Sequence, residues 1–215
     1  YCDWSPDVCS SDLVQGIGGL MSITGERDDL PGGGPQKVGV AFSDLMTGLY
    51  STVAIQAALL SREKTGLGQH IDMALLDVQV ATLCNQSQNY LASGKAPGRY
   101  GNAHANIVPY QVFRASDQDF IIACGNDSQF VALCEAIGLT HLPEDPRFTR
   151  NAERVANREA IIEILSAHFL QGRAEEWIGR VHPRGVPIGA INSIAQALDE
   201  PQVKARNMQI GRAYV

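Results

Sequence analysis

One carboxylate in this sequence stands where nucleophilic chemistry is favourable. Asp44 precedes a segment, Leu45 to Lys64, whose apolar residues recur at three- and four-residue steps and predict a long helix. Together with Ser43, Asp44 is expected at the helix N-cap, where unpaired N–H groups and the helix dipole stabilise a carboxylate. Such a position keeps the carboxylate ionised and places N–H donors beside developing negative charge, as a carboxylate nucleophile requires. It equally suits a structural cap, so position alone leaves both roles open.

Other familiar catalytic motifs are missing from the sequence. Residues 16–19 lack the GxGxxG spacing of a dinucleotide fingerprint, and residues 32–37 lack the Gly-Lys-Ser/Thr of a P-loop. Neither GxSxG nor HExxH occurs. The histidines lie far apart without metal-ligand spacing, so we expect no metal and no catalytic role for four of them, His104 being the exception. The five are His70, His104, His141, His168 and His182.

The composition indicates a globular protein without a nucleic-acid or membrane role. The 215 residues are 45% hydrophobic and 19% charged, enough for one large domain or two small ones. A net charge of −6 disfavours phosphate binding. The densest basic group, at positions 147, 150, 154 and 158, is interleaved with acids and predicts a solvated helix face. No apolar run approaches the ~20 residues that cross a bilayer, and no signal peptide is visible.

The cysteines favour a reducing compartment. Their number is odd, five, and none shows CxxC spacing. Cys84, Cys124 and Cys134 stand among apolar residues, which predicts buried free thiols. We therefore expect a cytoplasmic protein.

The elements that would position Asp44 change character along the chain. Up to about residue 93, helix and strand alternate: after the long helix comes a strand, His70–Leu75, and a second helix, Leu76–Ala92. Core positions expected on that second helix are Val80, Leu83 and Leu91. This pattern predicts an α/β piece.

The rest of the chain predicts an α+β piece. A Gly- and Pro-rich linker occupies residues 94–106, and two strands, Ile107–Phe113 and Phe120–Cys124, then form a hairpin. Apolar periodicity predicts mainly helices after the hairpin, and the second of these helices has one apolar side. They are Gln129–Ile137, Arg158–Leu170, Glu175–Val181 and a turn at Ile194–Leu198.

The two ends of the sequence differ from the rest. Residues 1–13 show neither helical nor strand periodicity, and they resemble a peptide encoded by sequencing-adapter DNA. We predict that this segment is non-native, with a genuine irregular arm before Val14 as the alternative. Residues 208–215 stop without a capped element. Both ends lead us to expect a fragment of a longer protein.

Several segments together resemble one enzyme family. Residues Phe42–Tyr50, followed by Ala57–Gln69, are similar to the core of class III CoA-transferases, the family of formyl-CoA transferase, carnitine CoA-transferase and α-methylacyl-CoA racemase. Matches extend from Val14 to Met208. Further matching segments are Gln15–Gly25, Gly101–His104, Val108–Phe113, Gly125-Asn126 with Gln129-Phe130, and Gly185–Pro187.

The resemblance implies a fold and a site. The fold class is α/β: residues 14–93 would be part of a Rossmann-like large domain, and residues 107–200 a smaller α+β domain. Residues 94–106 would form a linker and active-site loop, although they lack the glycine run of formyl-CoA transferase. Residues 201–215 would begin a truncated return segment. Asp44 falls on the catalytic aspartate, and the residues implied to contact substrate or CoA are Gln15, Gly101, Asn102 and His104.

The resemblance also implies a covalent reaction without a cofactor. An aspartyl-acyl anhydride and an aspartyl-CoA thioester would carry CoA from an acyl-CoA to a free carboxylic acid, with CoA itself as substrate. The segments most resemble transferases that use succinyl-CoA with glutarate, hydroxymethylglutarate or related dicarboxylates. Full-length family members form interlocked homodimers.

Two alternatives stay open. The racemase branch of the family pairs its aspartate with an upstream histidine, but that position here corresponds to about Gly16, and no histidine precedes His70. Two-sided proton transfer would then lack a partner. The other alternative is a truncated chain that is inactive, or a binding module at most.

Overall fold

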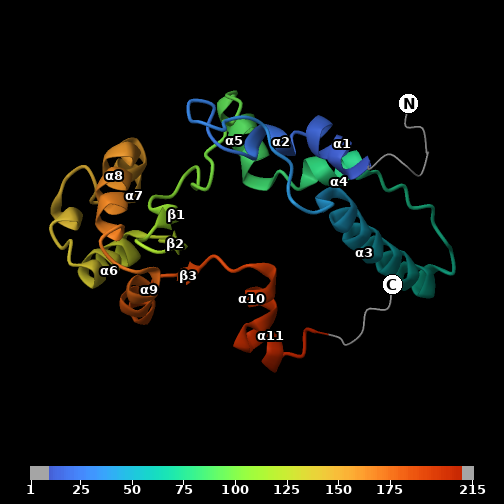
Figure 1. The fold of residues 1–215 in the computed structure, drawn as a ribbon. Coiled ribbons are helices and arrows are strands. Elements are labelled where there is room, and N and C mark those ends of the chain that lie inside the picture. The colour runs from blue at the N-terminus through green and yellow to red at the C-terminus, as the bar shows by residue number, and fades with distance from the viewer. Residues whose placement is uncertain (1–9, 210–215) are drawn as a thin grey trace. The chain divides into compact units, whose positions relative to one another are not determined.

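The computed structural model describes residues 10–209, which divide into two compact units (Figure 1). The first unit ends at Asn102 and the second begins at Ala103. This division falls inside the stretch 94–106 that the sequence predicts as a linker. Each unit is described separately below.

Helices joined by loops make up the described part of the first unit. Its β-structure within these residues is one isolated bridge between Glu26 and Gly33. The helices are α1 (Ser10–Ile17), α2 (Leu20–Ile23), α3 (Phe42–Thr65), α4 (Leu75–Ala81) and α5 (Cys84–Ser93).

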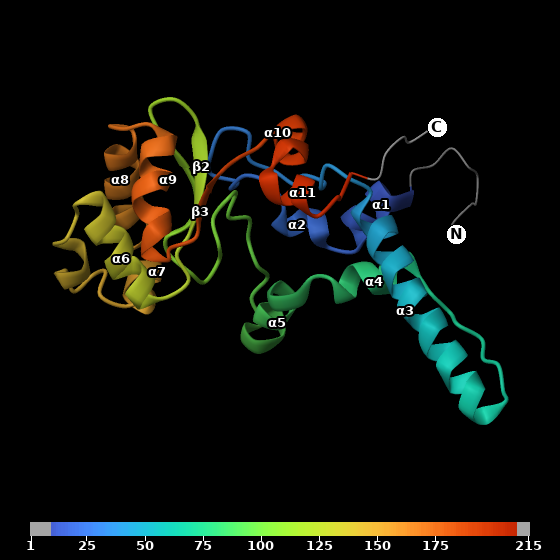
Figure 2. The same cartoon turned by 90° about the horizontal axis from the view of Figure 1, so that it is seen from below.

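The predicted long helix is α3, which spans 24 residues. It ends before Gly66, which has a left-handed φ of 74° and whose N–H donates to the Arg62 carbonyl at 2.8 Å. Helices α1 and α4 pack against its start, and Figure 2 shows the rest of α3 extending beyond both. Ser43 is its one residue described as buried. The apolar stripe is exposed, including Leu45, Leu49, Val53 and Leu60.

The strand predicted at His70–Leu75 is wrong. The chain has no regular structure from His70 to Ala74, and Leu75 already begins α4. A strand requires a neighbour for its backbone hydrogen bonds. Within the described residues, the first unit offers no strand that could pair with this segment.

The single helix predicted over Leu76–Ala92 is broken into α4 and α5. The break falls at residues 82–83, and Cys84, the first residue of α5, has a positive φ of 48°. Val80 and Leu91 are exposed and Leu83 is half-buried, whereas Val78 and Gln79 of α4 are buried. The expected core positions are therefore wrong for Val80 and Leu91.

The second unit contains a small antiparallel sheet. Strands β1 (Tyr110–Arg114) and β2 (Asp119–Ala123) form the predicted hairpin, with Phe113 opposite Phe120. The third strand, β3 (Ile188–Ala190), pairs with β2 and gives the order β1-β2-β3. The sequence did not predict β3, because three residues are too few to show an alternating pattern. Helices with a small sheet confirm the mixed fold class.

Helices cover the sheet of the second unit on one side, where α6 to α9 gather in both views (Figures 1 and 2). The predicted helices at Gln129–Ile137, Arg158–Leu170 and Glu175–Val181 are confirmed with small shifts. The described helices are α6 (Asp127–Ile137), η1 (Leu142–Glu144), α7 (Asn151–Ala156), α8 (Arg158–Phe169), α9 (Ala174–Val181), η2 (His182–Arg184), α10 (Ile194–Asp199) and α11 (Pro201–Ala205).

The hydrophobic core belongs to the second unit. Phe169 of α8 meets Phe113 and Phe120 of the sheet with ring centroids 5.1 Å apart in both cases. Ile161 and Leu165 are buried on the same side of α8, as its periodicity predicts. These side chains belong to one continuous cluster of buried residues. The burial of its large aromatic side chains contributes most to its stability.

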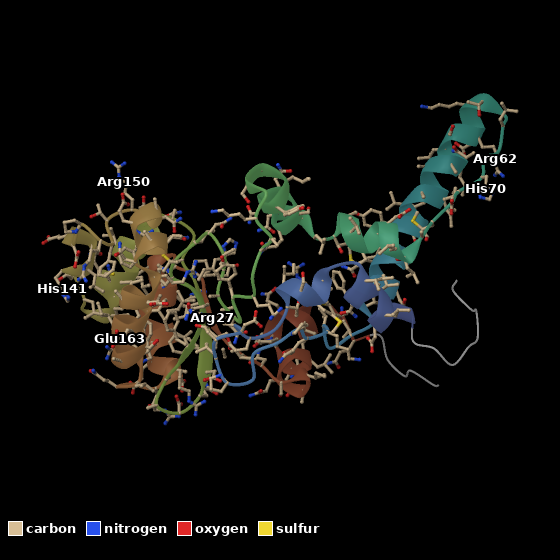
Figure 3. The ribbon with its side chains drawn as sticks, turned by 90° about the horizontal axis from the view of Figure 1, so that it is seen from above. Arg27, Arg62, His70, His141, Arg150 and Glu163 are labelled. Atoms are coloured by element: carbon tan, nitrogen blue, oxygen red, sulfur yellow. The ribbon has the colours of Figure 1, made fainter. Side chains whose placement is uncertain are left out.

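The basic group that the sequence assigned to a solvated face is divided. Arg150 points outward (Figure 3), but Arg154 is only 1% exposed. The guanidinium of Arg154 donates to the Val108 carbonyl at 2.7 Å and to Asp127 Oδ1 at 2.8 Å. The prediction is therefore wrong for Arg154, because its donors link three segments of the unit internally.

Predictions for the ends and the cysteines have mixed outcomes. Ser10 to Leu13 begin α1, so irregular structure is wrong for these residues, while residues 1–9 and 210–215 lie outside the described part. Cys124 and Cys134 are buried and free, as predicted. Cys84 is exposed at the start of α5, so the prediction of a buried thiol is wrong for this residue.

Candidate active site

Asp44 lies in the first turn of α3 with its side chain exposed. The helix begins at Phe42, and Ala41 occupies the N-cap, so the prediction of Asp44 as the N-cap residue is wrong. The Leu45 N–H already donates to the Ala41 carbonyl at 3.0 Å, which starts helical bonding before Asp44. The carboxylate still stands at the positive end of the helix dipole.

Gln15 holds the segment that leads into α3. Its side chain is fully buried in α1. Its Oε1 accepts from the Val38 N–H at 2.9 Å, and its Nε2 donates to the Val40 carbonyl at 3.5 Å. Gln15 is thus a buried link between α1 and the backbone preceding Asp44. A direct contact between Gln15 and substrate stays a prediction.

A second buried link lies beside Asp44. Ser43 Oγ donates to Gln79 Oε1 of α4 at 2.7 Å, and Gln79 Nε2 donates to Thr82 Oγ1 at 3.2 Å. A Cβ on Gly18 would come within 2.5 Å of Gln79 Cγ, so glycine permits this close approach. The start of α3 is therefore fixed by α1 and α4. Sequence reasoning missed Gln79, because apolar periodicity assigns polar residues to the surface.

Gly101 and Asn102 close the first unit. Gly101 has a positive φ of 59°, and a Cβ there would meet Glu26 Oε1 at 2.5 Å. Arg99 fixes the same region, since its Nε donates to the Glu26 carbonyl at 3.3 Å and its guanidinium pairs with Asp28. These contacts give Gly101 a structural reason to be glycine. Asn102 is exposed.

His104 belongs to the second unit and is half-buried. The Asn106 N–H donates to His104 Nδ1 at 3.1 Å. Its ring stacks on Tyr110, with centroids 5.2 Å apart and planes 27° apart. The structure thus places Gln15 next to the segment that precedes Asp44. His104, another predicted site residue, lies in a loop of the other unit.

Metal and membrane sites are not found in the part of the chain that is described. Among residues 10–209, no group of three or more His, Cys, Asp or Glu side chains could hold a metal ion. No helix in this range combines the length and apolar character needed to cross a bilayer. The chemistry available at Asp44 is that of an accessible carboxylate at the start of a long helix, next to backbone that Gln15 and Gln79 bind.

Comparisons with known proteins agree on one family. The model of a family described as CoA-transferase family III matches residues 3–211. A succinate–glutarate CoA-transferase of Agrobacterium fabrum is 47% identical over 198 residues, which are 92% of this chain and 48% of that protein. An acetyl-CoA:oxalate CoA-transferase of Acetobacter aceti is 41% identical over 92% of this chain and 50% of its own length.

A solved structure shows the same fold. The crystal structure of a CAIB/BAIF family protein from Brucella suis is 50% identical, with a TM-score of 0.76 over 93% of this chain and 52% of that one. The chain spans about half the length of the curated relatives it matches.

Proposed function

Because the chain belongs to CoA-transferase family III, we propose that it moves coenzyme A between an acyl-CoA thioester and a free carboxylic acid, with Asp44 as the nucleophile. The observation that carries this proposal is the exposed Asp44 carboxylate in the first turn of α3. Two buried links, through Gln15 and Gln79, fix the backbone around it. A carboxylate held this way is accessible and preorganised for attack.

The proposed reaction passes through two kinds of covalent intermediate. The Asp44 carboxylate attacks the donor thioester carbonyl, the C–S bond breaks, and an aspartyl-acyl anhydride and CoA thiolate form. The thiolate then attacks the Asp44 carbonyl, which releases the donor acid and leaves an aspartyl-CoA thioester. The acceptor carboxylate attacks that thioester, and the freed thiolate takes the acceptor acyl group, restoring Asp44. Thioester energy is kept throughout, so no cofactor besides CoA is needed.

Dicarboxylates are the proposed acids, with succinyl-CoA as donor. The names of the relatives from Agrobacterium fabrum and Acetobacter aceti include succinate, glutarate and oxalate, all of which are dicarboxylates. Their identities of 47% and 41% support a related substrate class for this chain. An assay with succinyl-CoA and a panel of dicarboxylates tests this, and turnover with formate or carnitine alone would contradict it.

The geometry gives no support to the racemase alternative. A racemase moves a proton between two faces of a carbon and therefore needs a second acid or base. At the expected place, about Gly16, this chain has no titratable side chain, and the amide of neighbouring Gln15 is bonded to Val38 and Val40. The first histidine, His70, follows the far end of α3 (Figure 3).

An inactive chain is the other alternative, since the relatives are about twice as long. Calorimetry with CoA distinguishes the two: binding by the 215-residue chain supports a functional site, whereas binding only by a longer gene product favours inactivity of this chain. We further propose that the gene product works as an interlocked homodimer, which light scattering can test.

The mutational test uses two matched aspartates in the gene product that contains this chain. Asp44→Ala should lower CoA transfer by several orders of magnitude, because the covalent route is lost. Asp77→Ala is the control, since Asp77 is also exposed in the first turn of a helix of the same unit. Equal effects of the two substitutions would contradict the role of Asp44.

A further inference from the structure

We propose that His104 donates a hydrogen bond through Nε2–H to an anionic oxygen of the substrate, and that Asn106, Tyr110 and Arg158 are its positioning residues. The inference rests on the proposed CoA-transferase function, and it assigns the substrate contact of His104 to the Nε2–H group. The substrate oxygen would belong to a carboxylate of the donor or acceptor acid.

The tautomer of His104 follows from its neighbour in the loop. The Asn106 backbone N–H lies 3.1 Å from His104 Nδ1, and a backbone N–H can only donate. Nδ1 must therefore accept, so the proton of the neutral ring resides on Nε2. A ring in this state offers a donor at Nε2 and no lone pair there, which suits binding of an oxyanion rather than general-base chemistry.

The plane of the ring is fixed by Tyr110 in β1. The two rings are stacked at 5.2 Å with 27° between their planes. The His104 backbone N–H also donates to the Tyr110 carbonyl at 2.9 Å, so main chain and ring are held by the same residue. Nδ1 thus accepts a hydrogen bond, and Tyr110 covers one face of the ring. The other ring nitrogen, Nε2, has no hydrogen-bond partner in the described part of the structure.

The loop around His104 is anchored from α7 and α8. Arg158 Nη2 donates to the carbonyls of His104 at 2.9 Å and Ala105 at 2.8 Å. Asn151 Nδ2 donates to the Asn106 carbonyl at 2.8 Å. Side chains from two helices thus hold three consecutive carbonyls. A fixed donor to an anionic oxygen requires such preorganisation, and Arg158 adds a positive charge to the same loop.

The first experiment measures the tautomer in the 215-residue chain itself. Histidine is labelled with ¹⁵N, and the His104 signals are assigned by their loss in His104→Gln. We expect the Nε2–H tautomer, and an Nδ1–H tautomer would overturn the inference. Adding succinyl-CoA and then glutarate should shift the His104 Nε2–H signal; no shift with either probe would also overturn it.

The second experiment replaces His104 in the gene product that contains the chain. Glutamine places an amide N–H near Nε2, whereas asparagine places it near Nδ1. His104→Gln should retain most of kcat/KM, while His104→Asn and His104→Ala should lose roughly tenfold or more. His141→Ala is the control, since His141 is an exposed residue of the same unit (Figure 3). Equal losses in all three His104 variants, or no loss in any, would overturn the inference.

A double-mutant cycle tests whether Arg158 acts through His104. Arg158→Lys should lower kcat in the wild-type background but cost little more in His104→Ala, because the group it positions is already gone. Full additivity would show a merely structural role. If the wild-type gene product transfers no CoA, the proposed function fails, whereas the tautomer and the response to succinyl-CoA still test the His104 donor separately.

Discussion

At the scale of single residues, exposure divides the side chains near the start of α3 into two roles. Asp44 is exposed, while Gln15 and Ser43 close to it are buried and bonded to other elements. A buried amide that is bonded to the backbone can position a neighbouring group but cannot act as a general acid or base. Burial thus separates the proposed nucleophile from the side chains that support its backbone, and the sequence does not display burial directly.

The sequence indicated Asp44 as the nucleophile through the family resemblance of the segment around it, and this role stays a prediction. Its position within the helix could not be predicted, because N-cap preferences favour Ser43 or Asp44 over Ala41. The structure begins α3 without a side-chain cap. Gln79 was missed for a different reason: its burial depends on Ser43 and Gly18, which are distant in the sequence.

The cysteines provide a prediction at this scale. Burial raises the pKa of Cys124 to about 11 and that of Cys134 to about 12. At pH 8 both stay protonated, and the thiolate is the reactive species. Iodoacetamide should therefore label exposed Cys84 in the folded protein and spare Cys124 and Cys134, as peptide mass spectrometry can measure. Labelling of Cys124 as fast as Cys84 would contradict the described burial.

The same thiols affect stability at high pH. Their folded pKa values lie above the ordinary value of 9.0, so above pH 9 the unfolded chain loses these protons first. The free energy of unfolding should consequently fall as the pH rises above 9. Urea titrations of wild type and Cys124→Ala at pH 7 and pH 10 measure this, and the wild type should lose more stability between the two pH values.

At the scale of elements, apolar periodicity predicted helices more reliably than it predicted burial. The 3.6-residue pattern of α3 is present, yet Leu49 and Val53 are more than 60% exposed. In α8 the same kind of pattern marks a buried face. Periodicity reports that a helix has an apolar side, whereas burial needs a partner element that the pattern does not identify.

This contrast predicts unequal effects of one substitution in two helices. Leu165→Ala in α8 should lower the free energy of unfolding by about 2–5 kcal/mol, because it leaves a cavity in the core. Leu49→Ala in α3 removes a side chain that is 62% exposed and should cost less than about 1 kcal/mol. Urea unfolding followed by hydrogen exchange measures both. Similar losses would contradict the assignment of the core.

The link between α3 and α4 gives another prediction. Gln79→Ala should destabilise the first unit by about 1–3 kcal/mol, because it leaves the buried Ser43 hydroxyl without its acceptor. Gln56→Ala, at an exposed position of α3, is the matched control and should stay within about 0.5 kcal/mol. Hydrogen exchange of the first turn of α3 reports the change. No difference between the variants would show that this contact does not support the helix start.

At the scale of the whole molecule, the two units differ in their cores. The continuous cluster of buried apolar side chains lies in the second unit. Among the described residues of the first unit, Val14 and Val78 are the apolar ones that are buried. Local stability follows buried apolar contacts. Amides of β2 and α8 should therefore exchange slowest with deuterium, and those of α3 beyond Leu49 much faster; the reverse order would contradict this description.

The family, by contrast, was accessible from the sequence at this scale. Matching segments from Val14 to Met208 indicated CoA-transferases, and the family model matches residues 3–211. The break between α4 and α5 and the strand β3 were not accessible, because each depends on contacts made only after the chain has folded.

The central claim is that Asp44 carries CoA during transfer, and a trapped intermediate tests it most directly. The gene product is incubated with succinyl-CoA without an acceptor, digested at acidic pH, and analysed by mass spectrometry. We predict an aspartyl-CoA thioester on the peptide that contains Asp44, present in Asp77→Ala and absent in Asp44→Ala. Transfer that persists in Asp44→Ala, or an adduct on another residue, would contradict the account.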